Sequence, residues 1–355
     1  MRYSGLWIGS LLLLSACIER IALDESLSGQ PLLVVDGGVS NQAGSYQVAL
    51  SYTSPTLEAY QGEVLSGAEV YVTDQEDNRT ELIETTANSG VYATDSATFR
   101  GKVGDAYQLH IVTPSGRTYA SIPETIPPVS AVDSIYFSVE SRPEVNLVGN
   151  VTDEWGLQFY VETADNNDQT VYYRWTWSET FQFPTPIIPP GPPSDVATIC
   201  YLTAFPPRVI RLASTQGLQS NRIKQKLNFV TMSGRQLQVR YSLLVRQHAL
   251  TERAYTYWQN VQQQVESVGG IFDPPPSPLV GNMYNVDDDR ETVLGYFQAS
   301  SLTEKRIFVS RSEVPSSPDG STPGPSSACS GESPSDFCLD CSLVPGATTV
   351  PPSFW

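Results

Sequence analysis

Tyr172-Tyr173-Arg174-Trp175-Thr176-Trp177, near the middle of the 355-residue chain, consists mainly of aromatic and β-branched residues. Such residues favour β-strands. Side chains alternate between the two faces of a strand, so Tyr173, Trp175 and Trp177 share one face, while Tyr172 and Arg174 share the other. One of these faces must pack in a core, and the segment therefore indicates a β protein.

The sequence on both sides of this segment extends the β pattern. Residues 157–163 and 170–180 resemble the two arms of a hairpin around a polar turn at residues 165–168. Residues 183–194 are rich in proline, which cannot donate to a central ladder of hydrogen bonds. Further strands are expected at residues 135–139, 235–245, 292–297 and 306–310, and a low-complexity loop is expected at residues 316–327.

The N-terminal third of the chain consists of short strands separated by turns. Apolar residues alternate with polar ones at residues 46–52 and 107–111, and a polar turn at residues 74–78 separates two more strands. This spacing predicts an N-terminal β-sandwich over residues 30–125. The sequence IPETIPP at residues 122–128 is typical of a stiff interdomain linker, because proline restricts the backbone. A larger β-rich domain is expected over residues 129–355.

One segment departs from the β pattern. Thr251 is expected to cap a helix over residues 251–268 that is stopped by Gly269-Gly270. An apolar stripe recurs at helical spacing at Tyr255, Trp258, Val261, Val265 and Val268. We expect this stripe to pack in the core.

The N-terminus reads MRYSGLWIGSLLLLSAC over residues 1–17. Its apolar run is too short to span a bilayer, and Leu14-Ser15-Ala16-Cys17 resembles a bacterial lipobox. We therefore expect removal of residues 1–16, acylation of Cys17 (as with palmitate) and a tether over residues 17–29. Ile18 is not the acidic residue that holds many lipoproteins at the inner membrane, so the outer membrane is expected. Glu19, Asp24 and Glu25 form an acidic patch that resembles the surface-export signals of some bacterial lipoproteins, and it favours the cell surface. The alternative is an ordinary secretory signal with an incidental cysteine.

The charge balance narrows the class of partner. The chain has 38 acidic and 21 basic residues, for a net charge of −17. A phosphate backbone requires a basic surface, so nucleic acid is not an expected partner. Docking on anionic lipid is disfavoured for the same reason.

Four cysteines follow the anchor: Cys200, Cys329, Cys338 and Cys341. An even number in an exported protein predicts two disulfides, for which three pairings are possible. A Cys338–Cys341 bridge would constrain little, so we favour pairings in which both reach outward or one joins Cys200. A zinc site is the alternative, and an oxidising compartment argues against it.

The sequence contains no recognisable catalytic constellation. The chain has two histidines, His110 and His248, and neither accompanies a nucleophile motif, a phosphate loop or a dinucleotide fingerprint. The acidic clusters at residues 287–291 and 165–168 do not follow a calcium-loop pattern and are expected to be solvated turns. We therefore expect no catalytic residue, no metal and no cofactor.

The aromatic arm suggests a contact surface. The face that does not pack in the core could, together with the proline-rich loop at residues 183–194, contact a partner. The residues proposed for this contact are Tyr172, Arg174, Trp175 and Trp177. The alternative is that packed layers cover both faces.

Several segments, taken in order, resemble domain-of-unknown-function family 4249, lipoproteins found in Bacteroidota. The segments are the lipobox, the N-terminal β-sandwich, Tyr172-Tyr173-Arg174-Trp175 leading to Glu179-Thr180, TERAYTYWQNVQQQ at residues 251–264, Gly281-Asn282-Met283, Val293-Leu294-Gly295-Tyr296-Phe297, and Cys338-Leu339-Asp340-Cys341 leading to Pro352-Ser353-Phe354-Trp355. The N-terminal part is also similar to immunoglobulin-like or transthyretin-like modules. The resemblance covers nearly all of the mature chain, and it implies an outer-membrane lipoprotein that works alongside TonB-dependent receptors.

Together these observations predict an all-β, non-enzymatic lipoprotein. We expect an accessory subunit that docks on a TonB-dependent transporter or another outer-membrane barrel and aids capture or uptake of a nutrient. One alternative is a structural subunit of a larger outer-membrane export or barrel-assembly complex with no small ligand. Another is a cryptic hydrolase.

Overall fold

The structure is a computed structural model, and it describes residues 31–54, 62–95, 99–145, 149–164, 170–186, 197–206, 209–218, 221–267, 279–325, 329 and 336–355. This part consists mostly of β-strands with one α-helix, which confirms the expected all-β class. Cys17, the tether, the turn at residues 165–168, residues 187–194 of the proline-rich loop, Val268 and Gly269-Gly270 lie outside the described residues. No helix in the described ranges is long and apolar enough to cross a membrane.

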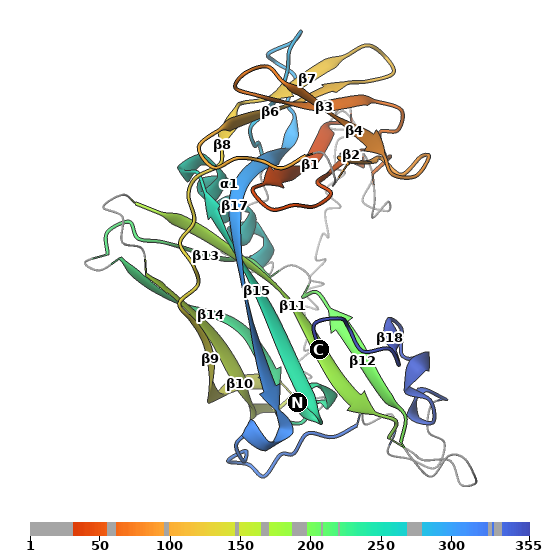
Figure 1. The fold of residues 1–355 in the computed structure, drawn as a ribbon, viewed down its shortest axis with the longest axis vertical. Helices are drawn as coiled ribbons and strands as arrows, with labels where there is room; N and C mark the ends of the chain where they lie inside the picture. Colours follow the sequence, from red (N-terminus) through yellow and green to blue (C-terminus); the bar gives the residue numbers. More distant parts are fainter. Residues whose placement is uncertain are drawn as a thin grey trace, which may run out of the picture.

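The N-terminal module, at the top of Figure 1, is a β-sandwich of eight short strands. These are β1 (Leu33–Ser40), β2 (Gln47–Tyr52), β3 (Glu69–Asp74), β4 (Arg79–Glu84), β5 (Val91–Ala93), β6 (Ala106–Val112), β7 (Thr118–Ser121) and β8 (Glu124–Thr125). The alternating residues Val48, Leu50, Leu109 and Ile111 are buried in one cluster. The period-two pattern of the sequence therefore identified the inward faces of β2 and β6 correctly.

The turn between β3 and β4 follows from a single carboxylate. Asp74 accepts hydrogen bonds from the backbone N–H groups of Glu76 (2.9 Å) and Asn78 (3.0 Å). Asp77 adopts the left-handed conformation, with φ of 62°. Asp and Asn tolerate this geometry better than most residues, so the sequence itself specifies this hairpin.

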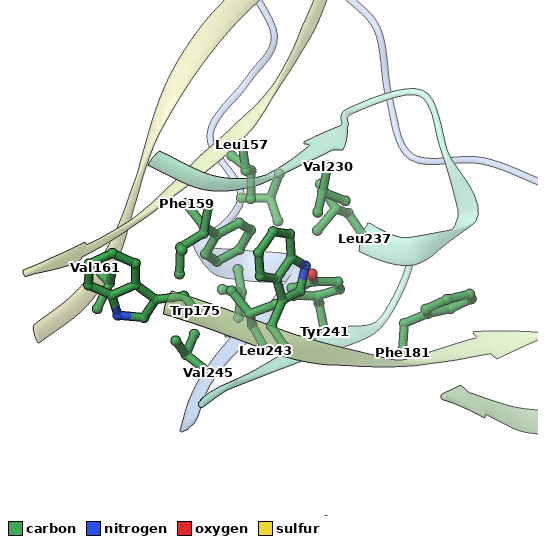
Figure 2. Close-up of a cluster of buried hydrophobic side chains, with 14 of the residues drawn as sticks. Leu157, Phe159, Val161, Trp175, Phe181, Val230, Leu237, Tyr241, Leu243 and Val245 are labelled. Carbon is green, nitrogen blue, oxygen red and sulfur yellow. The ribbon is translucent and has the colours of Figure 1, made fainter. Parts of the chain in front are cut away.

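The C-terminal module consists of two sheets that pack face to face. One contains β9 (Ser134–Val145), β10 (Val151–Ala164) and β14 (Arg222–Thr231). The other contains β11 (Tyr172–Pro184), β12 (Ile199–Ala204), β13 (Arg211–Ser214) and β15 (Arg240–Leu250). Figure 2 shows the core between them, where Phe159, Trp175 and Tyr241 are buried. The strand expected from residue 235 begins at Arg240, after a 3-10 turn at Arg235–Leu237.

The predicted hairpin of residues 157–163 and 170–180 is wrong. β10 pairs with β9 and β14, whereas β11 pairs with β12, β13 and β15. Each strand has an apolar face, and these faces are buried against each other across the core instead of lying in one sheet. A period-two pattern is the same in either arrangement, so it could not distinguish them.

β17 (Leu294–Ser310) joins the two modules as a single 17-residue strand, drawn in blue in Figure 1. Its first part pairs in parallel with β1, from Leu294 to Ser300. Its second part pairs antiparallel with β15, from Ser301 to Ser310. The sequence predicts two separate strands, at residues 292–297 and 306–310, and this prediction is wrong. The hydrogen bonds between strands join backbone groups, so the strand continues through the polar residues between the two apolar segments.

The core of the N-terminal module is not closed by residues 30–125 alone. Met283 and Phe297 are buried in it, and β16 (Met283–Asn285) pairs with β7. The buried Asn282 side chain donates to the backbone carbonyl of Phe297 and accepts from its N–H, each at 2.9 Å. The division of the sequence at residues 125–129 therefore differs from the packing, in which late residues return to complete the first module.

Two glycines permit the close approach of these returning segments. Gly295 has a φ of 89°, and a Cβ there would lie 1.9 Å from the Val35 carbonyl oxygen. A Cβ at Gly281 would lie 1.7 Å from the carbonyl oxygen of Gly295. Only glycine fits at these crossings, since any side chain would meet backbone.

The helix α1 (Glu252–Glu266) lies at the waist between the modules (Figure 1). Thr251 caps it as predicted, with its hydroxyl accepting from the backbone N–H of Ala254 at 3.2 Å. The predicted packing of the apolar stripe is confirmed for Tyr255 and Trp258, is wrong for Val265, and falls outside the described residues at Val268. Ala254 is the one helix residue that is buried, and 44% of Val265 is exposed. The helix packs mainly through the aromatic rings of its first half, on Tyr172, Leu212 and Tyr296.

The four cysteines form two disulfides, Cys200–Cys341 and Cys329–Cys338. Both members of the Cys338-Leu339-Asp340-Cys341 motif therefore pair outward, as favoured from the sequence. Cys200–Cys341 joins β12 to the C-terminal tail, where β18 (Ala347–Thr348) extends the sheet beside β12. The terminal Trp355 packs edge-on against Tyr201 and Phe308.

Candidate functional site

Two adjacent cavities lie where α1 meets the strands that join the modules. β1, β17, β15 and β11 are neighbours in that order within one sheet. Positions spaced by two along each strand project from the same face, and α1 covers part of that face. One cavity of about 400 Å³ lies over β1, and one of about 690 Å³ lies beside the start of α1; Tyr296 lines both. We call the smaller the junction cavity and the larger the cap cavity.

The aromatic arm places its residues on opposite sides of the sheet. Trp175, labelled in Figure 2, is fully buried, and Trp177 in the same core is 4% exposed. These two residues are therefore unavailable to a partner, which corrects the predicted contact surface. Tyr172 and Arg174 lie on the other face, where α1 covers them. The ring of Tyr172 lies 5.0 Å from that of Tyr255.

Arg174 lines the junction cavity with a guanidinium that has no polar partner. Its Nε is buried, and its side chain makes no hydrogen bond or ion pair with any residue that the structure describes. The guanidinium carbon lies 3.9 Å from the ring centre of Trp258, so the indole covers one of its faces. Burial lowers the pKa of Arg174 to about 10, against the opposing effect of Asp36. The group stays charged at neutral pH.

Asp36 faces the same cavity from the other module. It lies on β1, opposite Tyr296 in the register with β17, and its side chain is exposed. No ion pair joins it to Arg174 or to any other side chain among the described residues. A negative and a positive group thus line one cavity from two modules without contacting each other.

A series of hydrogen bonds between side chains fixes the part of the cavity wall that lies between these charges. The Trp258 indole N–H donates to the side-chain oxygen of Gln298 at 2.8 Å, and the Gln298 amide donates to the hydroxyl of Ser300 at 3.0 Å. His248 lies 3.4 Å from the same hydroxyl and 3.2 Å from that of Thr176. Burial, then the charges of Arg174 and Arg246, lower the pKa of His248 to about 3. It is therefore neutral at pH 7.

The cap cavity is built around Glu124, which is 2% exposed. Its carboxylate accepts from the hydroxyls of Tyr296 (2.5 Å) and Thr251 (2.7 Å), and Arg253 lies 3.5 Å away. Burial, followed by the hydrogen bond with Glu124, raises the pKa of Tyr296. The contacts with Thr251 and Arg253 anchor the start of α1, and the contact with Tyr296 holds β17, so this carboxylate is occupied in holding the fold.

The other acidic and histidine residues considered from the sequence serve local structure. His110 stacks on Tyr71 at 4.8 Å in the N-terminal module, away from the junction. Glu291 accepts from Tyr119 (2.7 Å) and Asn285 (2.6 Å). Asp165 and Asp168 lie outside the described residues. Within the described ranges, no group of three His, Cys, Asp or Glu side chains is placed to hold a metal ion.

The structure also brings together a carboxyl pair that sequence spacing did not reveal. Glu144 and Glu154 are diagonal neighbours on the paired strands β9 and β10, and Arg142, opposite Glu154, contacts it at 2.6 Å. The hydrogen bond with Glu154 is the largest cause of the raised pKa of Glu144. Carboxyl groups that touch are closer than the roughly 5 Å or more needed for glycoside hydrolysis.

The sequence indicates Arg174 as a contact residue and names Trp258 and His248 in other roles, but it does not indicate that these residues share a cavity. A charged residue in the middle of a strongly apolar strand was the one available signal. Asp36, Trp258, Gln298 and Ser300 carry no motif, because they come from three separated segments that only the fold brings together.

The comparisons with known proteins identify a family and no curated relative. The family model described as "Domain of unknown function (DUF4249)" matches residues 18–306. A search of curated proteins found no match to the chain. The matched range contains the N-terminal module, most of the C-terminal module and every residue of the junction cavity named above, and it ends before the last residues of β17 and the tail that carries β18.

Proposed function

The chain belongs to the family described as a domain of unknown function, DUF4249, and from this premise we propose that it is a lipid-anchored capture protein of the bacterial outer membrane. In this proposal the protein is not an enzyme. It binds a small nutrient and acts as an accessory subunit of a TonB-dependent transporter.

The observation that carries the proposal is the junction cavity. A cavity of about 400 Å³ is within the size range of small-molecule sites, and such sites combine apolar walls with a few oriented polar groups. Arg174, Asp36 and the Trp258–Gln298–Ser300 chain supply such groups. A rigid wall of this kind favours binding, because little side-chain freedom is lost when a ligand arrives.

The anchor and the transporter come from the sequence. Leu14-Ser15-Ala16-Cys17 supports lipid attachment at Cys17, which would hold the folded modules at the membrane surface. The resemblance of the chain to Bacteroidota lipoproteins supports a TonB-dependent barrel as the partner. A barrel with a capture subunit beside its mouth would gain a raised local concentration of ligand.

The chemistry of the cavity argues against a hydrolase. His248 and Ser300 are close enough to suggest a nucleophile and its base. A base with a pKa of about 3 is far from the near-neutral value that proton abstraction favours, however. Its other ring nitrogen faces the Thr176 hydroxyl and not a carboxylate, so no negative charge there would stabilise an imidazolium.

A pull-down from native outer membranes tests the proposal. The tagged chain is extracted in mild detergent, and the co-purifying proteins are identified by mass spectrometry. A TonB-dependent barrel in stoichiometric amount is the expected result. The Cys17→Ser variant is the matched control, because it should leave the membrane fraction and lose the barrel while remaining folded.

Two outcomes would overturn parts of the proposal. Recovery of the acylated chain alone would reject a stable transporter complex. Recovery of export or barrel-assembly subunits instead would reject the capture role and favour a structural subunit.

A further inference from the structure

The junction cavity holds two opposite charges that do not neutralise each other. Arg174 comes from β11 of the C-terminal module and Asp36 from β1 of the N-terminal module. Both line the same cavity, yet they form no ion pair, and neither forms one with another described side chain. The Nε is buried without a partner, and no described residue supplies an acceptor to the guanidinium, so a ligand that brings an acceptor to its terminal N–H groups would be favoured.

The orientation of the guanidinium specifies the type of acceptor. Trp258 covers one face at 3.9 Å and is itself fixed by Gln298. The N–H edge is thereby left for the ligand. A planar guanidinium fork matches the two oxygens of a carboxylate, and the resulting pair of charge-assisted hydrogen bonds is both strong and directional.

The remaining charges exclude a strongly anionic ligand. His248 is neutral, and Arg174 is the one basic residue that lines the junction cavity among the described residues. Asp36 would repel a second negative charge. The same carboxylate would attract a cation, so a ligand with one negative and one positive group matches the wall, whereas a phosphate dianion does not.

We infer that the junction cavity binds a free amino acid or short peptide, with its carboxylate on Arg174 and its ammonium group beside Asp36. This inference rests on the capture function proposed above and names its ligand class. The binding site itself needs no barrel, so it can be tested in the absence of a partner. If the protein binds no such ligand, the proposed transporter complex still stands. If no transporter complex is found, the proposed ligand site still stands.

The test is isothermal titration of the purified full chain with the twenty free amino acids and with trialanine. We expect at least one of these to bind. For the best ligand, amidation of the carboxylate and acetylation of the amine should each weaken binding by about 10- to 100-fold, as expected for losing hydrogen bonds to a charged group. This comparison leaves the protein unchanged, so it does not depend on any variant folding.

The variants Arg174→Gln and Asp36→Asn test the two ends separately. R174Q should remove the preference for a free carboxylate, and D36N should remove the preference for a free amine. Arg240→Gln is the matched control, because Arg240 also stacks on an aromatic ring, Phe308 at 4.2 Å, but lies at the far end of β15. It should bind as the unmodified protein does.

Three results would overturn the inference. They are no binding of any amino acid or of trialanine by the folded protein, equal affinity for the free and blocked ligands, or binding of inorganic phosphate in preference to all of them.

Discussion

At the scale of single residues, one buried amide shows how polar groups hold the two sheets of the C-terminal module together. Gln247 is fully buried and accepts hydrogen bonds from the Trp175 indole (2.9 Å) and the Thr163 hydroxyl (2.6 Å). Its amide donates to the carbonyl of Ser130 at 2.9 Å. It therefore ties β15 to β11, β10 and the segment before β9. Each of these hydrogen bonds satisfies a buried polar group that would otherwise have no partner.

Glu140 makes a residue-scale prediction about pH. Hydrogen bonds from Lys226, then Tyr160, lower the pKa of Glu140 to about 2. Because this is below the unfolded value of about 4.3, the stabilisation is complete above that value and is lost as the pH falls toward about 2. Glu140→Gln should lower the free energy of unfolding by about 1 kcal/mol at neutral pH, a figure reduced for solvent exposure of the pair.

Urea unfolding at about pH 7 and about pH 3 measures this effect, and the difference between variant and wild type should shrink at the lower pH. Glu63→Gln is the control, because Glu63 is exposed and its side chain makes no hydrogen bond to a described residue. A difference that stays constant between the two pH values would contradict the assignment of the stabilisation to the ionised carboxylate.

At the scale of elements, α1 is held by its first turn and not by a broad apolar face. Thr251 uses one hydroxyl twice, accepting from Ala254 and donating to the buried Glu124. The negative carboxylate at the helix N-terminus also suits the helix dipole. The position of the helix, and hence of Trp258 over Arg174, depends on these contacts together with the aromatic rings that pack from its first half.

Thr251→Ala should destabilise the protein by about 2–3 kcal/mol. The loss of an N-cap costs about 1 kcal/mol, and the buried Glu124 carboxylate also loses a donor. Thr256→Ala is the matched control. Its hydroxyl donates to the Glu252 carbonyl at an exposed mid-helix position, so the change should be within about 0.5 kcal/mol. Equal effects of the two substitutions in urea unfolding would refute the capping argument.

At the scale of the whole molecule, two long-range devices keep the modules and the tail in place. β17 belongs to both modules, since it pairs with β1 at one end and β15 at the other. The Cys200–Cys341 disulfide joins residues 141 positions apart, whereas Cys329–Cys338 spans 9. A cross-link that closes a longer loop removes more entropy from the unfolded chain.

Replacing both cysteines of each disulfide with alanine should separate their contributions. C200A/C341A should lose roughly 4–5 kcal/mol of stability, and C329A/C338A roughly 2–3 kcal/mol. Equilibrium unfolding of both variants under oxidising conditions measures which of the two loses more stability. A greater loss from the short-loop variant would show that local strain or packing, and not loop entropy, dominates.

The sequence by itself determined the class of fold, the single helix with its cap, and the inward faces of the strands. These depend on local properties, namely side-chain alternation, β-propensity and capping geometry, which a short window of residues contains. The same alternation placed Trp175 and Arg174 on opposite faces, and the packing agrees.

Only the tertiary structure decided which strands are neighbours and what the polar face of β11 meets. β10 and β11 lie in different sheets, β17 continues through a polar stretch, and late residues complete the N-terminal core. The junction cavity likewise combines Asp36, Arg174 and Trp258 from distant parts of the chain. Strand pairing and cavity formation depend on contacts between segments that are far apart in the sequence. Those contacts form where whole apolar faces become buried against each other, and a short stretch of sequence does not show which faces will meet.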